Sequence, residues 1–241
     1  MKRRKLELAI GLIFLIGIFI GCAPQLFYKN SGVSVSNGTP GNGSLSNAYL
    51  INYKMDNSRY FSLMSYYLLG NGYVNSRVYH TLIDSYKECE KTCPGKDFRI
   101  MECSSKKGGK QLIHRTHKNG LSVDFMVPKI KKGKQSKIYD RIGLWHYLLN
   151  FDSQGYLNIN KNVMIDFETM GKHIIALDNA AHINGLKVKK VILKINLKDD
   201  FFKTDSGKEI KRRGIYFARY LTEKVDNVHD DHYHIDFEVI N

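Results

Sequence analysis

The sequence lacks most of the features that assign a chain to a structural class at once. Cys89 and Cys93 are closely spaced, but neither a second cysteine pair nor a nearby histidine follows at the spacing of a zinc finger. No internal repeat or heptad pattern is present, which argues against a solenoid or a coiled coil. The main apolar run, residues 8–20, is too short for a comfortable membrane span. The 241 residues allow one large domain or two small ones, and we expect one.

Acidic residues are also scarce compared with basic ones. The chain has 37 Lys and Arg against 23 Asp and Glu, which gives a formal net charge of +14. Residues 1–22 carry four basic residues and one acidic residue, so the rest of the chain keeps +11. A surface with this excess attracts anionic polymers.

The N-terminus has the pattern of an export signal. The basic letters MKRRK precede the apolar run, as in secretory signals. The run ends in FIGC, where Cys22 resembles the lipid-modified cysteine of a bacterial lipobox, with Phe19 in place of the more usual Leu. The alternatives are cleavage near Gly21 and an uncleaved anchor. We interpret residues 1–22 as a lipoprotein signal peptide, which predicts a lipid anchor on a bacterial membrane, in the cell envelope, facing the periplasm or the cell wall.

The composition then changes. Residues 23–46 are rich in Gly, Ser, Asn and Pro and predict a flexible tether, although order in the second half stays open. Residues 47–241 form the expected domain. In an oxidising compartment one pair of its cysteines can close, and the sequence does not tell which. The three candidates for this pair are Cys89, Cys93 and Cys103.

Two stretches far apart in the sequence concentrate histidines and carboxylates. In residues 114–125, HRTHKNGLSVDF, a strand places Asp124 on the face opposite the apolar residues, because side chains alternate along a strand. In residues 229–237, HDDHYHIDF, a strand places His232 and His234 together on one face, with aromatic and aliphatic residues behind them. Each stretch therefore predicts a polar face backed by core residues.

If these two strands share a sheet, His117, Asp124 and His234 can converge. Two imidazole nitrogens and one carboxylate oxygen are a normal ligand set for a catalytic zinc, which keeps a fourth position for water. His232 would lie beside the ion as the base that takes a proton from this water or stabilises the oxyanion. Three further carboxylates stay open between orienting these groups and a solvated position: Asp230, Asp231 and Asp236.

A helix is predicted for residues 166–183. Asp166 is a suitable N-cap, and apolar residues recur on one stripe. His173 and His182 fall off or beside this stripe and are expected at the surface, and His146 is expected to be a packed or surface residue rather than a ligand. The predicted fold class is α+β, with a small, mainly antiparallel sheet that carries the zinc site and is flanked by helices.

The motifs resemble a known family. His117 and Asp124 seven positions apart, with a late His232-x-His234, resemble the signature of the lysostaphin, D-Ala-D-Ala peptidase and murein endopeptidase superfamily of zinc peptidases. Within it, the chain is similar to the penicillin-insensitive murein endopeptidases over roughly residues 36–241. The features that carry this closer similarity are His114-x-x-His117, Gly120, His229 and the segment NGTPGNGSLSNAY.

The resemblance implies that residues 47–241 are a zinc metallopeptidase domain, and hence a hydrolase of peptidoglycan (murein). The implied reaction is cleavage of D-alanyl cross-links between stem peptides by metal-activated water. His114 and His229 are predicted to orient ligands, contact the oxyanion or hold substrate. Endopeptidase versus carboxypeptidase preference, stem-peptide chemistry and oligomeric state are not fixed by the sequence.

Two other classes compete with this prediction. His232-Tyr233-His234 also has the His-hydrophobic-His form of metal-dependent nicking and replication-initiation nucleases, and a basic chain with 15 tyrosines suits nucleic acid. The export signal and the spacing from His117 to Asp124 argue against nucleic acid as a partner. A wall-binding lipoprotein without activity is the other alternative, and the presence of all expected ligands argues against it.

Overall fold

The computed structural model describes residues 2–109 and 116–240. Helices and sheets are both present, which confirms the predicted α+β class. The α-helices are α1 (Lys2–Leu26), α2 (Ser76–Thr92), α3 (Phe167–Ile183), α4 (Lys198–Phe201), α5 (Asp205–Arg212) and α6 (Glu223–Asp226). Four short helical segments of 3-10 or π type are η1 (Met64–Leu69), η2 (Ile138–Arg141), η3 (Gly143–Leu148) and η4 (Ile195–Leu197).

The largest sheet of the described residues has six strands in the order β13-β14-β8-β7-β5-β4. The β5–β7 pair is parallel and the other pairs are antiparallel, so the sheet is mainly antiparallel, as predicted. Its strands are β4 (Lys54–Met55), β5 (Ser58–Tyr60), β7 (Phe98–Ile100), β8 (Ser122–Met126), β13 (Leu186–Ile192) and β14 (His232–Val239).

Smaller sheets complete the strand structure. A four-stranded sheet has the order β10-β9-β12-β11, and two further pairs join β1 to β2 and β3 to β6. The strands are β1 (Val35–Thr39), β2 (Asn42–Ser46), β3 (Tyr49–Leu50), β6 (Tyr73–Val74), β9 (Lys129–Lys131), β10 (Lys134–Gln135), β11 (Tyr156–Leu157) and β12 (Asn160–Ile165).

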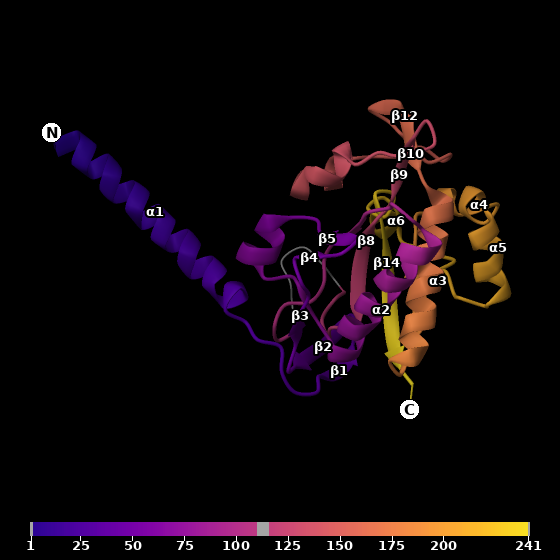
Figure 1. Ribbon diagram of the computed structural model, residues 1–241, viewed down its shortest axis with the longest axis horizontal. Helices are drawn as coiled ribbons and strands as arrows, with labels where there is room; N and C mark the ends of the chain where they lie inside the picture. The colour runs from indigo at the N-terminus through magenta and orange to yellow at the C-terminus, as the bar shows by residue number, and fades with distance from the viewer. Residues whose placement is uncertain (1, 110–115, 241) are drawn as a thin grey trace.

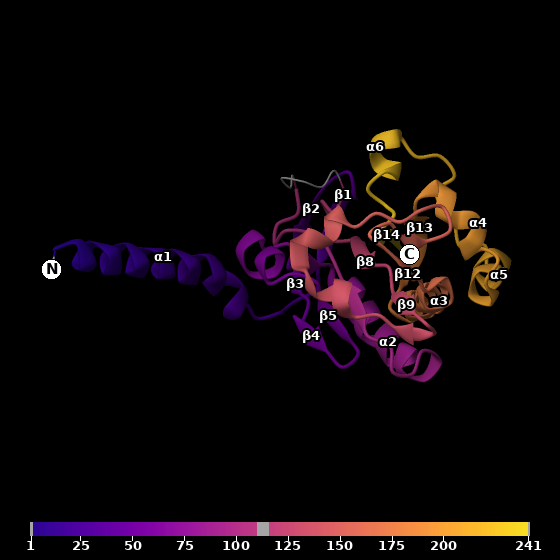
Figure 2. The same cartoon turned by 90° about the horizontal axis from the view of Figure 1, so that it is seen from above.

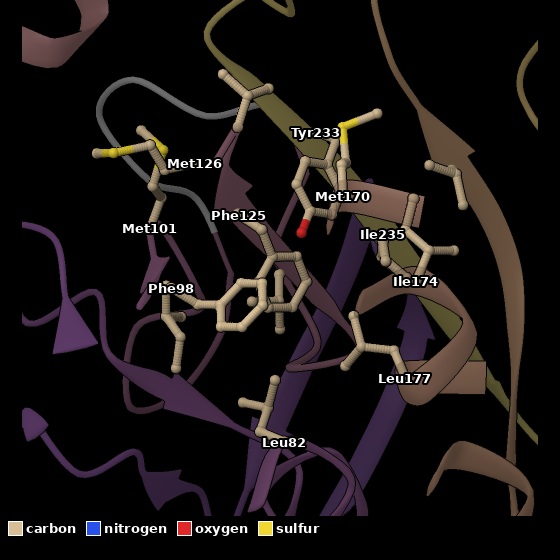
Figure 3. Packing of buried hydrophobic residues seen from close by; sticks show 14 of the residues in the cluster. Leu82, Phe98, Met101, Phe125, Met126, Met170, Ile174, Leu177, Tyr233 and Ile235 are labelled. Carbon is tan, nitrogen blue, oxygen red and sulfur yellow. The ribbon is translucent and has the colours of Figure 1, made fainter. Parts of the chain in front are cut away.

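Helices α2 and α3 pack side by side and cover one face of the six-stranded sheet (Figure 1). Seen from above, α2 and α6 lie on opposite sides of β8 and β14 (Figure 2). The apolar faces of β8 and β14 meet α3 in the core, where Phe125 and Tyr233 stack with ring centroids 5.4 Å apart (Figure 3). This packing fixes which face of each strand is left for the polar residues.

Helix α3 begins and ends where the sequence indicates. The Asp166 side chain accepts a hydrogen bond from the Thr169 backbone N–H, as an N-cap does. Gly185, at φ 68°, follows the end of the helix. The prediction that His173 lies at the surface is wrong, because its ring is fully buried between α3 and the sheet, where Nδ1 shares a hydrogen bond with the Tyr233 hydroxyl. His182 is exposed, as expected.

The second half of the segment predicted as a tether is ordered. Strands β1 and β2 form a hairpin there, and Leu45 is buried. The hairpin packs on the loop after residue 115: the Ser36 hydroxyl donates to the Asn119 carbonyl at 2.6 Å, and the Lys118 N–H donates to the Pro40 carbonyl at 2.9 Å. The sequence left the order of this half open, and backbone hydrogen bonds together with the burial of Leu45 supply it.

At the N-terminus, α1 extends away from the rest of the chain and includes Cys22, which is partly exposed (Figure 1). None of the helices in residues 2–109 and 116–240 is long and apolar enough to cross a membrane. The four cysteines all lie in the described residues and none is in a disulfide, so the structure selects no pair among them.

Candidate metal centre

The pairing of β8 with β14 places the two motifs side by side. The strands are antiparallel neighbours, and the register sets Asp124 directly opposite His234. Both side chains lie on the face away from α3, because the residues on either side of them in each strand fill the core. The prediction that the two strands share a sheet is therefore confirmed.

His117 reaches the same place from the preceding loop. Its backbone has φ 66°, a left-handed conformation that is uncommon for a residue with a side chain and that often occurs at functional sites. The Ser104 hydroxyl donates a hydrogen bond to the His117 carbonyl and holds it there. Gly120, at φ 75°, closes the loop where a Cβ would come within 2.8 Å of the Asn75 backbone nitrogen. Only glycine fits this turn, which brings the chain from His117 into β8.

The three predicted ligands meet at one point. The Asp124 carboxylate lies between two imidazoles, with Oδ2 3.1 Å from His117 Nε2 and Oδ1 2.7 Å from His234 Nδ1. One ligand atom from each of the three side chains lies within 4.8 Å of the others, and all three residues are buried. Two nitrogens and one oxygen at this spacing form a group that can hold a metal ion. We call His117, Asp124 and His234 the metal group.

The charges of this group support a cation between its members. Burial alone would raise the pKa of Asp124, but the two histidines outweigh it and hold this pKa well below its usual range. Burial would likewise lower the pKa of His234, but the carboxylates of Asp236 and Asp124 raise it to about 10. The carboxylate is thus ionised, and the His234 ring between two carboxylates carries a positive charge that a metal ion can replace.

A second carboxylate orients His234 from behind. Asp236 Oδ1 lies 2.7 Å from His234 Nε2 and accepts a hydrogen bond from the Ser122 hydroxyl at 2.6 Å, while Oδ2 pairs with Lys190 Nζ at 2.8 Å. A carboxylate on the far nitrogen of a ligand imidazole fixes the ring and makes the other nitrogen a better ligand. The sequence left the position of Asp236 open, and the structure places it against the Nε2 of His234.

His232 lies two residues before His234 on the same face of β14, and it is not one of the three residues that could hold a metal ion. Its Nδ1 is 2.5 Å from Asp231 Oδ1, and its ring centroid is 5.9 Å from that of Tyr147. Burial alone would lower the pKa of His232, but the Asp231 carboxylate outweighs it and raises this pKa. His232 is thus held by Asp231 and is not part of the group formed by His117, Asp124 and His234.

His229 belongs to the same cluster. Its ring centroid is 4.7 Å from that of His232 and 6.3 Å from that of His234, and its Nδ1 donates to the Val225 carbonyl at 2.6 Å. Burial, followed by repulsion from His232, lowers the pKa of His229 to about 3, so the ring is neutral. His114, the other histidine predicted to act near the ion, lies outside the described residues.

Glu102 is a residue beside the site that the sequence reasoning missed. Its backbone carbonyl accepts from the Asp124 N–H at 2.9 Å, and its buried carboxyl accepts from the Ser65 hydroxyl at 2.9 Å. Burial raises the pKa of Glu102 to about 7. Glu102 is the single acid in the apolar segment FRIMEC, the same signal that marks Asp124 within its own strand.

Neither a scan against family models nor a search of curated proteins finds a match to this chain.

Proposed function

We propose that the chain is a zinc-dependent peptidoglycan endopeptidase that hydrolyses D-alanyl cross-links between stem peptides. The observation that carries the proposal is the buried convergence of His117, Asp124 and His234 with His232 beside them. Buried imidazole and carboxylate groups at this spacing are expected where a metal ion is bound, and three protein ligands leave a position for water, as in catalytic zinc sites.

Zinc suits this donor set because it accepts both imidazole nitrogen and carboxylate oxygen. When bound, it would lower the pKa of a water molecule toward neutrality and polarise the scissile carbonyl. His117 and His234 would bind through the nitrogens that face Asp124, since their other nitrogens face the Ser122 carbonyl and Asp236. The chain therefore presents its ligand atoms with the opposite ring atoms already engaged.

His232 would move the proton. Its Nδ1 is held by Asp231, so the other ring nitrogen is the atom that can accept a proton from water and pass it to the departing amine. A pKa raised by Asp231 makes the ring a stronger base. Neutral His229, next to it, carries its proton on Nδ1, where the Val225 carbonyl accepts it, so its Nε2 can accept a hydrogen bond. Among the predicted roles of His229, this favours holding substrate over donating to the oxyanion.

The substrate class comes from three features outside the metal group. The motifs resemble those of murein endopeptidases, the basic head and apolar run suit export, and the charge of +11 after residue 22 suits a polymer with peptide carboxylates. A lipid on Cys22 would keep the enzyme at a bacterial membrane, facing the periplasm or cell wall. A C22A variant should lose both labelling by a fatty-acid analogue and membrane association.

The test of the activity is digestion of purified sacculi followed by mass spectrometry. Conversion of cross-linked dimers to monomers supports an endopeptidase, whereas loss of a terminal alanine alone would identify a carboxypeptidase. Chelation should abolish the conversion and zinc should restore it. A supercoiled plasmid in a parallel reaction should stay intact, and its nicking would favour the nuclease instead.

A further inference from the structure

A row of buried charged and polar side chains continues from His232 away from the metal group. Asp231 Oδ2 lies 2.9 Å from His146 Nδ1, His146 Nε2 lies 3.2 Å from Lys129 Nζ, and Lys129 Nζ pairs with Asp140 Oδ1 at 2.8 Å. Each of these residues is 3% exposed or less. Buried charges are expensive to desolvate, and apolar residues of similar size are often as stable, so this row calls for a role beyond packing.

Lys129 determines the direction of its hydrogen bond with His146. Its ammonium has donors and no acceptor: it donates to the Val127 carbonyl at 3.0 Å and lies against His146 Nε2, and it forms an ion pair with Asp140. His146 Nε2 must therefore accept. Burial, helped by the Lys129 ammonium, lowers the pKa of His146 to about 4, so the neutral ring carries its single proton on Nδ1.

The consequence passes to the proposed base. His146 Nδ1–H donates to Asp231 Oδ2 and orients the carboxylate so that Oδ1, which can only accept, faces His232 Nδ1–H at 2.5 Å. With the proton of the neutral His232 ring on Nδ1, the lone pair is on Nε2. An orienting carboxylate has the same effect on the histidine of a Ser-His-Asp triad.

We propose that Lys129 and His146 are positioning residues for His232, which hold the Asp231 carboxylate in the orientation that takes the His232 Nδ1 proton and leaves the Nε2 lone pair available. The catalytic part of this inference rests on the proposed function, whereas the placement of the proton does not. Neither residue belongs to the metal group, and both come from segments more than 80 positions before His232 in the sequence.

The decisive variant is D231N, because an amide has one donor side and one acceptor side. Since His146 Nδ1–H can only donate, the oxygen of the new amide must face His146 and its NH₂ group must face His232. His232 Nδ1 then has to accept, and the proton moves to Nε2. In the double variant D231N/H146L the donor is gone, so the amide can turn its oxygen to His232 and the proton returns to Nδ1.

Nitrogen NMR of the zinc-loaded chain, labelled with ¹⁵N-histidine and recorded where His232 is neutral, reads the proton position directly. The His232 signals are assigned by their loss in H232Q. We expect a protonated Nδ1 in the wild type and in H146N, which retains a donor toward Asp231, and a protonated Nε2 in D231N. A wild-type proton on Nε2, or a D231N proton that stays on Nδ1, would overturn the proposal even if the double variant fails to fold.

Turnover of a cross-linked muropeptide gives the second readout. D231N should lower kcat by about 10³-fold with zinc content and KM near wild type, and H146L in that background should recover at least about tenfold of the loss. A merely structural role predicts that the two lesions add. If neither the wild type nor any variant digests murein while the NMR pattern holds, the proposed function fails and the positioning role stands. If the wild type digests murein but the NMR pattern differs from the one expected, the positioning role fails and the proposed function stands.

Discussion

Asp124 contacts both His117 and His234, whereas His232 pairs with Asp231 and is not one of the three residues that could hold a metal ion. We therefore expect H117A and D124A to lose both zinc and activity. H232A should keep most of its zinc and lose turnover by about 10²- to 10⁴-fold, the usual contribution of a general base. Metal analysis of each purified variant beside its rate of muropeptide cleavage checks this.

H182A is the matched control for these substitutions, because His182 is an exposed histidine on α3. It should retain wild-type zinc content and turnover. Full activity in zinc-free D124A would contradict the metal mechanism, and wild-type turnover in H232A would assign the base to another residue.

The charge on His234 predicts how zinc binding responds to pH. Because the pKa of His234 is raised to about 10 when no metal is bound, zinc must displace a proton from this ring at neutral pH. Affinity should therefore rise as the pH increases from about 6 to about 9. Calorimetry in buffers of different ionisation enthalpy should detect about one proton released per zinc ion.

Removing the carboxylate behind His234 tests the same ring from the other side. D236N should weaken zinc binding by about 10- to 100-fold, as loss of a carboxylate behind a ligand imidazole usually does. The number of protons released should also fall, because one of the two carboxylates that charge the ring is gone. E238Q changes a partly exposed carboxyl on the same strand and should leave both quantities unchanged. An unaltered affinity in D236N would mean that Ser122 and the strand alone hold the ring.

At the scale of elements, local patterns predict the strands and the long helix of the site. Period-two alternation identifies β8 and β14, and Asp166 identifies the start of α3, because each feature depends only on neighbouring residues. His173 could not be placed this way. Its side of α3 is covered by both α2 and the sheet, so a polar residue beside the apolar stripe is as buried as the stripe itself.

The burial of His173 makes helix α3 sensitive to acid. Its ring stacks on both Tyr86 and Phe98, with centroids 5.0 and 4.8 Å away, and burial lowers the pKa of His173 to about 3. Below about pH 6.5 the unfolded chain binds a proton at this residue and the folded chain does not. The free energy of unfolding should therefore fall with decreasing pH, by up to about 1.4 kcal/mol per pH unit from this residue alone.

H173N isolates this effect, because its amide can still form a hydrogen bond with the Tyr233 hydroxyl, as donor or acceptor, but does not titrate. Denaturant unfolding between about pH 6 and about pH 4 should show a smaller loss of stability in H173N than in the wild type. H182N, with its exposed position on the same helix, serves as the control. Equal slopes for wild type and H173N would mean that the folded protein accommodates a charged ring at this position.

At the scale of the whole molecule, the site joins segments that lie far apart in sequence. The three residues of the metal group could be grouped from the sequence because Asp124 is the odd polar residue in its strand, His234 lies on the polar face of an alternating strand, and His117 lies in the loop just before Asp124. Lys129 and His146 could not, because their roles arise from contacts with each other and with Asp231, 85 positions beyond His146. A sequence pattern reports which face a side chain takes, but it does not report which distant side chain faces it.

The net charge of the molecule belongs to this scale as well, and it predicts how the protein meets its substrate. With +11 after residue 22, the chain should be attracted to murein over distances that salt controls, because the screening length shrinks from about 10 Å at 0.1 M to about 3 Å at 1 M. The H232A variant, expected to be inactive and kept in detergent, should co-sediment with purified sacculi at low salt. The amount that sediments should fall several-fold at about 1 M salt. Retention at high salt would show that short-range contacts dominate binding. In a competition, plasmid DNA is added at the same total negative charge as the sacculi. Charge alone does not distinguish the two polyanions, so displacement of the variant by DNA would show specific contacts with nucleic acid and favour a nucleic-acid partner.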